Sequence, residues 1–280
     1  MTERFKVDLL RTQLAGSPRV ELVVGKGRQH WYRVEGYVSK HKDGLWPSVT
    51  TILGATIPKP ALVPWAKNLA LEKMRQVMKS DGGAIWDTVG DYHSWVDDKI
   101  EAARRLPDQV RDEAGDFGTR AHQAISSWLK GGVEPEEGSE LRPPFVAFQE
   151  WMRDSGFEVL ATEVSVFNPV SEEQPGYAGT VDLLMREPGG MLAIADLKTS
   201  SGIYPEMALQ VAGYARAVRN MLGVMPTRGY ILRLPKVAPA EGKPSLEIRQ
   251  IRDLHAAFIA FCACLTLWEA LREPMWKEGG

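Results

Sequence analysis

Hydrophobic and polar positions alternate along residues 176–198, on both sides of a short break. The run reads GYAGTVDLLMREPGGMLAIADLK, and the break is Glu187-Pro188-Gly189-Gly190. Alternation with a period of two is typical of strands, and a Pro-Gly-Gly segment between two such runs is typical of a turn. The pattern therefore predicts an antiparallel β-hairpin.

Three charged side chains give this hairpin its chemical interest. Successive side chains of a strand point to opposite faces, so Asp196 and Lys198 share one face, and a suitable register brings Asp182 beside Asp196. Two carboxylates at the mouth of an apolar hairpin are costly unless a cation or a hydrogen-bond donor compensates them. Mg²⁺ or Mn²⁺ fits, because hard cations take oxygen ligands. Taken alone, an Asp-x-Lys at a strand end is more often a solvated surface pair.

Helical periodicity, with apolar residues three or four positions apart, dominates the first half of the chain. Pro107 is expected to open a helix, since proline is favoured in the first turn. The expected elements are strands over 19–24 and 29–38, a short helix after Ser48, and helices over 61–79, 84–105 and 107–130.

The second half mixes strand and helix patterns, which predicts an α/β fold. Glu163 lies in the first of its strands, and Gln210 and Tyr214 stand four residues apart on one helix, where they share a face. The expected elements are a helix over 145–152, a strand over 157–167, the hairpin, a helix over 205–221, strands over 229–234 and 246–251, and a helix from Asp253 to Leu271.

Composition narrows the class of protein. The chain has 280 residues and a net charge of −2, which excludes a generally basic nucleic-acid coat and leaves room for a local basic groove. Cys262 and Cys264 are its two cysteines, too few for a four-cysteine zinc or iron–sulfur site, and both are expected in the core. We find no secretory signal and no apolar run long enough to span a membrane, so a cytoplasmic location is expected.

Other polar residues have two interpretations each. Ser48, Thr50 and Lys59 can contact phosphate, or they form an ordinary helix cap and loop. His122 borders an apolar helical stripe, where a histidine is either a metal ligand or a satisfied core residue. Both alternatives stay open from the residues alone.

Four short motifs resemble a known family when they are taken together. They are GTRAH at 118–122, GTVD at 179–182, DLK at 196–198 and QVAGY at 210–214. Their order and spacing resemble the RecB-like branch of the PD-(D/E)XK nuclease superfamily over about residues 115–234. The segment PSVTTIL at 47–53 is similar to the N-terminal region of phage exonucleases and of the mitochondrial genome-maintenance exonuclease. CRISPR adaptation nucleases share the core but carry a four-cysteine cluster, so no iron–sulfur cluster is expected here.

The resemblance implies a mixed central β-sheet flanked by helices, with a nuclease core over 113–280 and an N-terminal clamp for DNA over 1–112. It also implies a role for each matched residue. The implied roles are Asp182, Asp196, His122 and the Leu197 carbonyl as metal ligands, Lys198 beside the attacking water, Glu163 in an outer metal position or supporting the ligands, and Gln210 with Tyr214 on the nucleic acid.

The expected function is metal-dependent hydrolysis of DNA, by an exonuclease acting on single strands or free ends. Its setting is replication, recombination or repair, in a phage or in a cell. The imidazole of His122 favours Mn²⁺ over Mg²⁺, because nitrogen ligands suit transition metals. The alternatives are a structure-specific endonuclease on the same core and a catalytically silent DNA-binding module.

Overall fold

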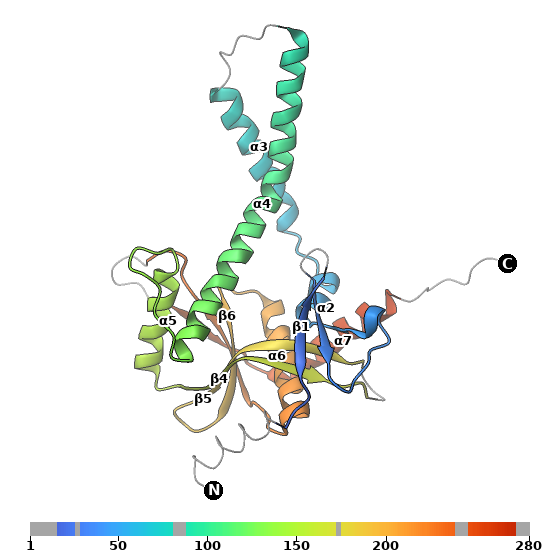
Figure 1. Ribbon diagram of the computed structural model, residues 1–280, viewed down its shortest axis with the longest axis vertical. Coiled ribbons are helices and arrows are strands. Elements are labelled where there is room, and N and C mark those ends of the chain that lie inside the picture. Colours follow the sequence, from blue (N-terminus) through green and yellow to red (C-terminus); the bar gives the residue numbers. More distant parts are fainter. Residues whose placement is uncertain (1–15, 26–28, 81–87, 172–174, 239–245, 273–280) are drawn as a thin grey trace, which may run out of the picture. The chain divides into compact units, whose positions relative to one another are not determined.

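A five-stranded mixed β-sheet forms the centre of the larger of two units in the computed structural model, which describes residues 16–25, 29–80, 88–171, 175–238 and 246–272 (Figure 1). The strands follow one another across the sheet in chain order. β6 and β7 pair in parallel and the other neighbours are antiparallel. The strands are β4 (Glu158–Asn168), β5 (Tyr177–Arg186), β6 (Leu192–Lys198), β7 (Arg228–Arg233) and β8 (Glu247–Gln250).

Helices cover both faces of this sheet, as the sequence predicts. On one face, Ile194 packs in a core formed with α2 (Val49–Thr56), α6 (Pro205–Leu222) and α7 (Leu254–Ala270). On the other face, Ala193, Ala195 and Leu197 pack against α5 (Arg142–Ser155) and the end of α4 (Val89–Leu129). The alternation predicted for the second strand of the hairpin is therefore confirmed.

A small N-terminal sheet packs onto the same unit. It contains β1 (Val20–Val24), β2 (His30–Val34) and β3 (Trp46–Pro47), with a short 3-10 helix, η2 (Lys42–Gly44), before β3. Tyr32, Trp46, Phe167 and Ala178 share a buried cluster, and Ser48 forms a parallel bridge with Ala178. These contacts join the N-terminal residues to the central sheet.

The division of the chain differs from the boundary expected at residue 112. Residues 1–57 and 121–280 form the larger unit, and residues 58–120 form the smaller one. The N-terminal residues belong to the larger unit because they pack on β4 and β5. The smaller unit contains α3 (Leu62–Ser80), in which no residue is fully buried, and the first part of α4.

The helix break expected at Pro107 is wrong, because α4 continues through this residue. Proline lacks an N–H, so one main-chain hydrogen bond is lost at a cost of about 3 kcal/mol. Its fixed φ near −65° is nevertheless helical, and the hydrogen bonds on either side carry the helix on. The start expected at residue 84 lies outside the described residues.

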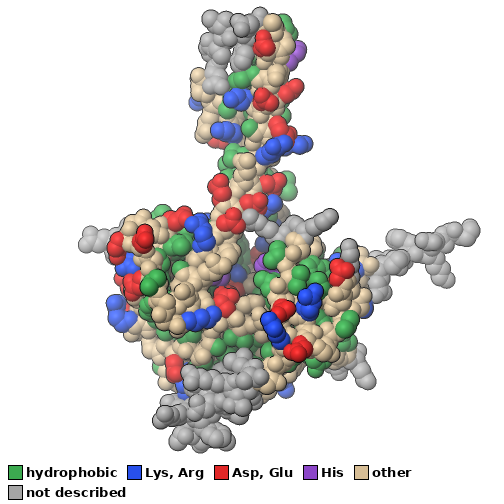
Figure 2. Space-filling view, in the orientation of Figure 1, with side chains coloured by type: hydrophobic (Ala, Val, Ile, Leu, Met, Phe, Trp, Pro, Cys, Tyr) green, Lys and Arg blue, Asp and Glu red, His purple; other side chains and the backbone are tan. Residues whose placement is uncertain are grey.

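Several local predictions are confirmed. Gly190 donates to the Glu187 carbonyl in the hairpin turn, and Asp253 caps α7 by accepting from the backbone amides of His255 and Ala256. Cys262 and Cys264, expected in the core, are instead half-buried at its edge on the α6 face. No helix of the described residues combines the length and hydropathy needed to cross a membrane. In Figure 2, acidic and basic side chains are interspersed over each unit, in keeping with the near-zero net charge.

Candidate active site

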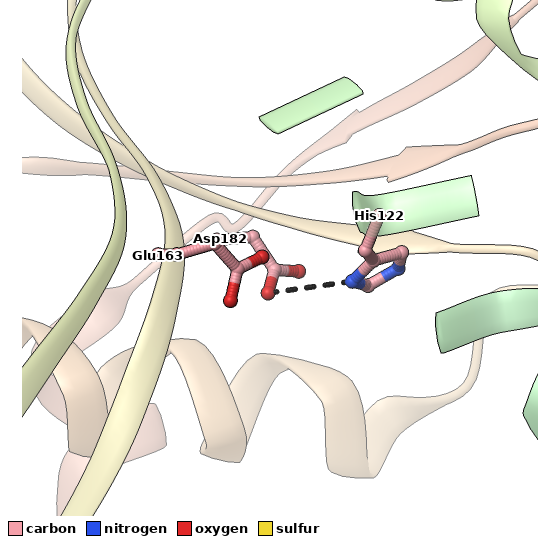
Figure 3. Close-up of side chains that lie close together, drawn as sticks. All are labelled: His122, Glu163 and Asp182. Carbon is pink, nitrogen blue, oxygen red and sulfur yellow. Dashed lines mark ion pairs between the residues drawn. The ribbon is translucent and has the colours of Figure 1, made fainter. Parts of the chain in front are cut away.

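Three side chains from separate elements converge at one point in the larger unit (Figure 3). His122 comes from α4, Glu163 from β4 and Asp182 from β5, and one potential ligand atom of each lies within 4.8 Å of the others. His122 Nδ1 is 3.5 Å from Asp182 Oδ1. We call these three residues the ligand cluster. Two carboxylates and an imidazole form a set of donors suited to a divalent cation.

Strand pairing brings the two carboxylates together. Thr162 pairs with Leu183 and Val164 with Val181, so Glu163 and Asp182 lie opposite each other between these pairs. Glu163 has a φ of 54°, in the left-handed region that costs a non-glycine residue about 1–2 kcal/mol. Such strain persists where the surrounding structure imposes it, and it is concentrated at functional sites. The strained backbone marks Glu163 independently of its charge.

A second group lies on β6 and α6. Lys198 Nζ is 2.6 Å from Asp196 Oδ2 and 3.2 Å from Gln210 Oε1. Gln210 Nε2 donates to Asp196 Oδ1 at 2.8 Å and to the Tyr214 hydroxyl at 3.2 Å. We call Asp196, Lys198, Gln210 and Tyr214 the lysine network. Its members come from one strand and one helix, as the period-two and four-residue spacings predict.

Gly179 makes room for this network. A Cβ built on Gly179 would lie 2.3 Å from Cε1 of Tyr214, far inside van der Waals contact. The aromatic ring therefore packs directly on the β5 backbone, and a side chain at this position would displace it. This contact gives a physical reason for the glycine of the GTVD motif.

The ligand cluster is electrostatically coupled. Burial alone lowers the pKa of His122, but the charge and hydrogen bond of Asp182, together with the charge of Asp196, outweigh burial and raise the pKa above its usual value. Burial alone raises the pKa of Asp182, but His122, Lys198 and the Leu197 amide together lower it. Burial and the charge of Asp182 raise the pKa of Glu163. Asp182 is thus the cluster's most persistent anion.

In the lysine network, the pKa values of both the carboxyl group and the ammonium are raised. Burial raises the pKa of Asp196 to about 6, with Asp182 adding to the rise and Lys198 opposing it. Burial by itself lowers the pKa of Lys198, but Asp196 and Asp182 raise it above its usual value. Lys198 is therefore a protonated ammonium at neutral pH.

One buried oxygen indicates whether the residues at the site suit a bound cation. Among the described residues, Asp196 Oδ2 is the one buried side-chain polar atom without a hydrogen bond, and its contact with Lys198 is an ion pair outside hydrogen-bond geometry. A buried acceptor without a donor is costly. Together with the oxygen and nitrogen donors of the ligand cluster, it suits a divalent metal ion.

The structure brings some predicted residues together and separates others. His122, Glu163 and Asp182 meet; Asp196 is outside that set, although its charge raises the pKa of His122. Leu197 donates its N–H to Asp182 Oδ2 at 2.7 Å, and ligation by its carbonyl stays a prediction.

The candidate phosphate contacts near the N-terminus have other surroundings. Ser48 is buried and its hydroxyl caps α2 by accepting from the Thr51 amide, which is the cap alternative. Thr50 is exposed, and its hydroxyl hydrogen-bonds to that of Ser48. Lys59 belongs to the smaller unit, outside the unit that holds the ligand cluster.

Three side-chain hydroxyls that contact one another near the site were not identified from the sequence. The Tyr32 hydroxyl is 2.9 Å from Thr180 Oγ1, and Ser165 Oγ is 3.5 Å from the same atom. Burial, with the charges of Glu163 and Asp182, raises the pKa of Tyr32 to about 12. Thr180 was detectable, because it shares a predicted face with Asp182. No sequence pattern marked Tyr32, because it reaches the site only through packing between the N-terminal sheet and the central sheet.

Comparison with known proteins adds little to this geometry. No protein-family profile matches the chain, and no curated protein matches it. One similar solved structure, described as the crystal structure of SSO0001, has 13% sequence identity and a TM-score of 0.31. The match covers 49% of this chain and 63% of that protein, which is less than two thirds of its length. A likeness of this size carries no argument about fold or activity.

Proposed function

We propose that this protein is a metal-dependent nuclease that hydrolyses phosphodiester bonds in DNA. The observation that carries the proposal is the ligand cluster, with His122, Glu163 and Asp182 within 4.8 Å of one another. The ion pair of Lys198 with Asp196, whose charge acts on the cluster, adds a cation to the same site. Carboxylates that hold a divalent ion beside a lysine are what attack on an anionic diester requires.

The residues that would hold the metal are His122, Glu163 and Asp182, with Asp196 Oδ2 as a further acceptor. A bound Mg²⁺ or Mn²⁺ would neutralise the phosphate charge and lower the pKa of a coordinated water. Mn²⁺ is favoured because an imidazole is among the donors. No iron–sulfur cluster is proposed.

Lys198 then acts as an acid or as an electrostatic partner rather than as a base. Its pKa is raised by Asp196 and Asp182 against the effect of burial, so its ammonium stays charged and can donate to the water or to an anionic phosphate oxygen. Gln210 holds both members of the pair, through Lys198 Nζ and Asp196 Oδ1. Gln210 and Tyr214 thus position the catalytic pair, and contact with the nucleic acid is their second proposed role.

The end-directed activity rests on the family resemblance alone. We propose an exonuclease that acts on single-stranded or free-ended DNA in the cytoplasm, in replication, recombination or repair. A covalently closed single-stranded circle separates this activity from the alternative, a structure-specific endonuclease, because an exonuclease leaves the circle intact. Cutting of the circle would replace the exonuclease with the endonuclease.

The central experiment is digestion of 5′- and 3′-labelled oligonucleotides, single- and double-stranded, with Mn²⁺, Mg²⁺ or EDTA. We expect cleavage with either metal, none with EDTA, and none by Asp196→Ala, while that variant still binds DNA. Asp154→Ala is the control, because it changes an exposed carboxylate that forms an ion pair with its neighbour Arg153. Asp253→Ala is unsuitable, because it removes a helix cap. Full cleavage by Asp196→Ala would refute the site. DNA binding without cleavage by the unaltered protein would favour the silent module.

A further inference from the structure

A polar hollow borders the ligand cluster at the end of α4. Its volume is about 570 Å³, within the range of ~300–1,000 Å³ that is usual for small-ligand sites. Glu163 forms part of its wall and also belongs to the ligand cluster. A molecule in the hollow would therefore lie directly beside the proposed metal site, and every lining residue belongs to the larger unit.

The lining is entirely polar or glycine. Gln123, Ser126, Ser127 and Lys130 supply an amide, two hydroxyls and an ammonium. Gln123, Ser127 and Lys130 are exposed, whereas Ser126 is buried. The Lys130 side chain is exposed, and its charge is near enough to lower the pKa of Glu163 against the effect of burial. The hollow thus offers one cation and several hydrogen-bonding groups, beside the carboxylate of Glu163.

Gly131 and Gly132 line the hollow where the chain leaves α4, and their amides form hydrogen bonds with carbonyls at the end of this helix. A Cβ on Gly132 would lie 2.3 Å from the Ser127 hydroxyl, so the chain can approach α4 here only without a side chain. The Gly131 and Gly132 amides donate to the carbonyls of Trp128 and Ser127. These bonds satisfy two of the last carbonyls of α4, and the negative end of the helix dipole favours a cation such as Lys130 there.

We infer that this hollow binds the nucleotide next to the scissile phosphate, with the Lys130 ammonium on that nucleotide's own phosphate. Gln123, Ser126 and Ser127 provide hydrogen bonds to its sugar or base edge. No aromatic residue lines the hollow, so recognition is by charge and hydrogen bonding rather than by stacking. This inference rests on the proposed nuclease function and extends it to a neighbouring nucleotide subsite.

The test measures binding and cleavage separately. Binding of a fluorescein-labelled single-stranded oligonucleotide is followed by anisotropy across a salt series with Ca²⁺, and cleavage is followed with Mn²⁺. Lys130→Gln should weaken binding and reduce the slope of log K against log salt by about 0.7, the value for one phosphate contact on a single strand. Lys130→Arg should keep the slope. Gln123→Glu, an isosteric change that adds a negative charge, should also weaken binding.

Arg252→Gln is the matched control, because it also removes one exposed positive charge. Arg252 follows Ile251, whose amide donates a hydrogen bond at the start of β7, whereas Arg233 lies at the other end of that strand. Its slope should match that of the unaltered protein. If the protein cleaves DNA and Lys130→Gln has an unchanged affinity and slope, the subsite is refuted and the nuclease stands. If binding depends on Lys130 and no cleavage occurs, the nuclease is refuted, and the hollow remains a phosphate-binding site without a role beside a scissile phosphate. Absence of both binding and cleavage would refute both.

Discussion

The ligand cluster and the lysine network use the two carboxylates of one hairpin in opposite ways. Asp182, in the ligand cluster, has a lowered pKa and faces an imidazole and a second carboxylate. Asp196, in the lysine network, has a pKa raised to about 6 and is held by an ammonium and an amide. Asp182 and Asp196 lie on adjacent strands, and their different surroundings shift the pKa values of the two carboxyl groups in opposite directions.

This difference suggests a division of roles. Neighbouring carboxylates with separated pKa values commonly serve separate chemical functions. Asp182 keeps its charge at physiological pH, which suits a permanent ligand, whereas Asp196 is already balanced by Lys198. Metal affinity should therefore depend most on the ligand cluster, and turnover should depend on both groups.

The largest effect is expected from Asp182→Asn. This isosteric change removes the central anion of the ligand cluster, so Mn²⁺ affinity should fall by at least ~100-fold, beyond the usual loss for residues behind the ligands. Cleavage should become undetectable. Isothermal titration calorimetry measures the affinity, with Asp154→Asn as an exposed control and circular dichroism as the folding check. Unchanged Mn²⁺ binding would remove the distinction between the two groups.

Lys198→Met should lower turnover while Mn²⁺ binding persists. Loss of a preorganised donor costs about 10²–10³ in kcat. Without the ammonium, the pKa of the buried Asp196 rises further and favours its protonation, so the assay is run in saturating Mn²⁺, which supplies countercharge. Calorimetry and single-turnover cleavage together measure the two effects. Equal losses of Mn²⁺ affinity and turnover would show that the lysine network belongs to the metal site.

Gly179→Ala tests the packing beneath the lysine network. The added methyl group clashes with Tyr214, so the ring must move and the hydrogen bond from Gln210 is strained. Overpacking of this kind costs about 1–3 kcal/mol in the free energy of unfolding, measured by urea denaturation. Gly189→Ala is the matched control, because nothing lies within 4 Å of a Cβ built there. Equal stability of the two variants would contradict the packing argument.

The smallest effect is a pH dependence of metal affinity. Protonation of Asp196, whose pKa is about 6, removes an acceptor for the cation, so affinity should fall as pH falls through that value. One such proton gives about a tenfold loss between about pH 7 and about pH 5. The raised pKa of His122 acts in the same direction. Asp196→Asn should make the profile shallower and leave the contribution of His122, and a flat profile in the unaltered protein would contradict this assignment.

Local periodicity was enough to predict much of the fold and the two halves of the lysine network, but not that the strand pair and the helix pair meet. Asp196 and Lys198 share a strand face, and Gln210 and Tyr214 share a helix face, because side-chain direction follows directly from spacing. The turn after Arg186 and the cap at Asp253 were also predictable, since both depend on residues close in sequence.

Non-local features could not be predicted in this way. Glu163 meets Asp182 through a strand register fixed by packing over the whole sheet, and its left-handed backbone has no counterpart in a propensity for glutamate. Tyr32 arrives through contact between two sheets. Pro107 was read as a helix start because local preference favours that position, whereas the hydrogen bonds around it carry the helix through.

The left-handed backbone of Glu163 has a consequence for evolution and engineering. Glycine adopts such a conformation freely, so Glu163→Gly would relieve a strain of about 1–2 kcal/mol, against about 0.5–1 kcal/mol of backbone entropy lost by glycine in a strand, while deleting one carboxylate of the ligand cluster. A selection for thermal stability alone would therefore enrich this substitution, and a selection for DNA cleavage would eliminate it. At position 163, the stability of the fold and the proposed activity therefore favour different residues.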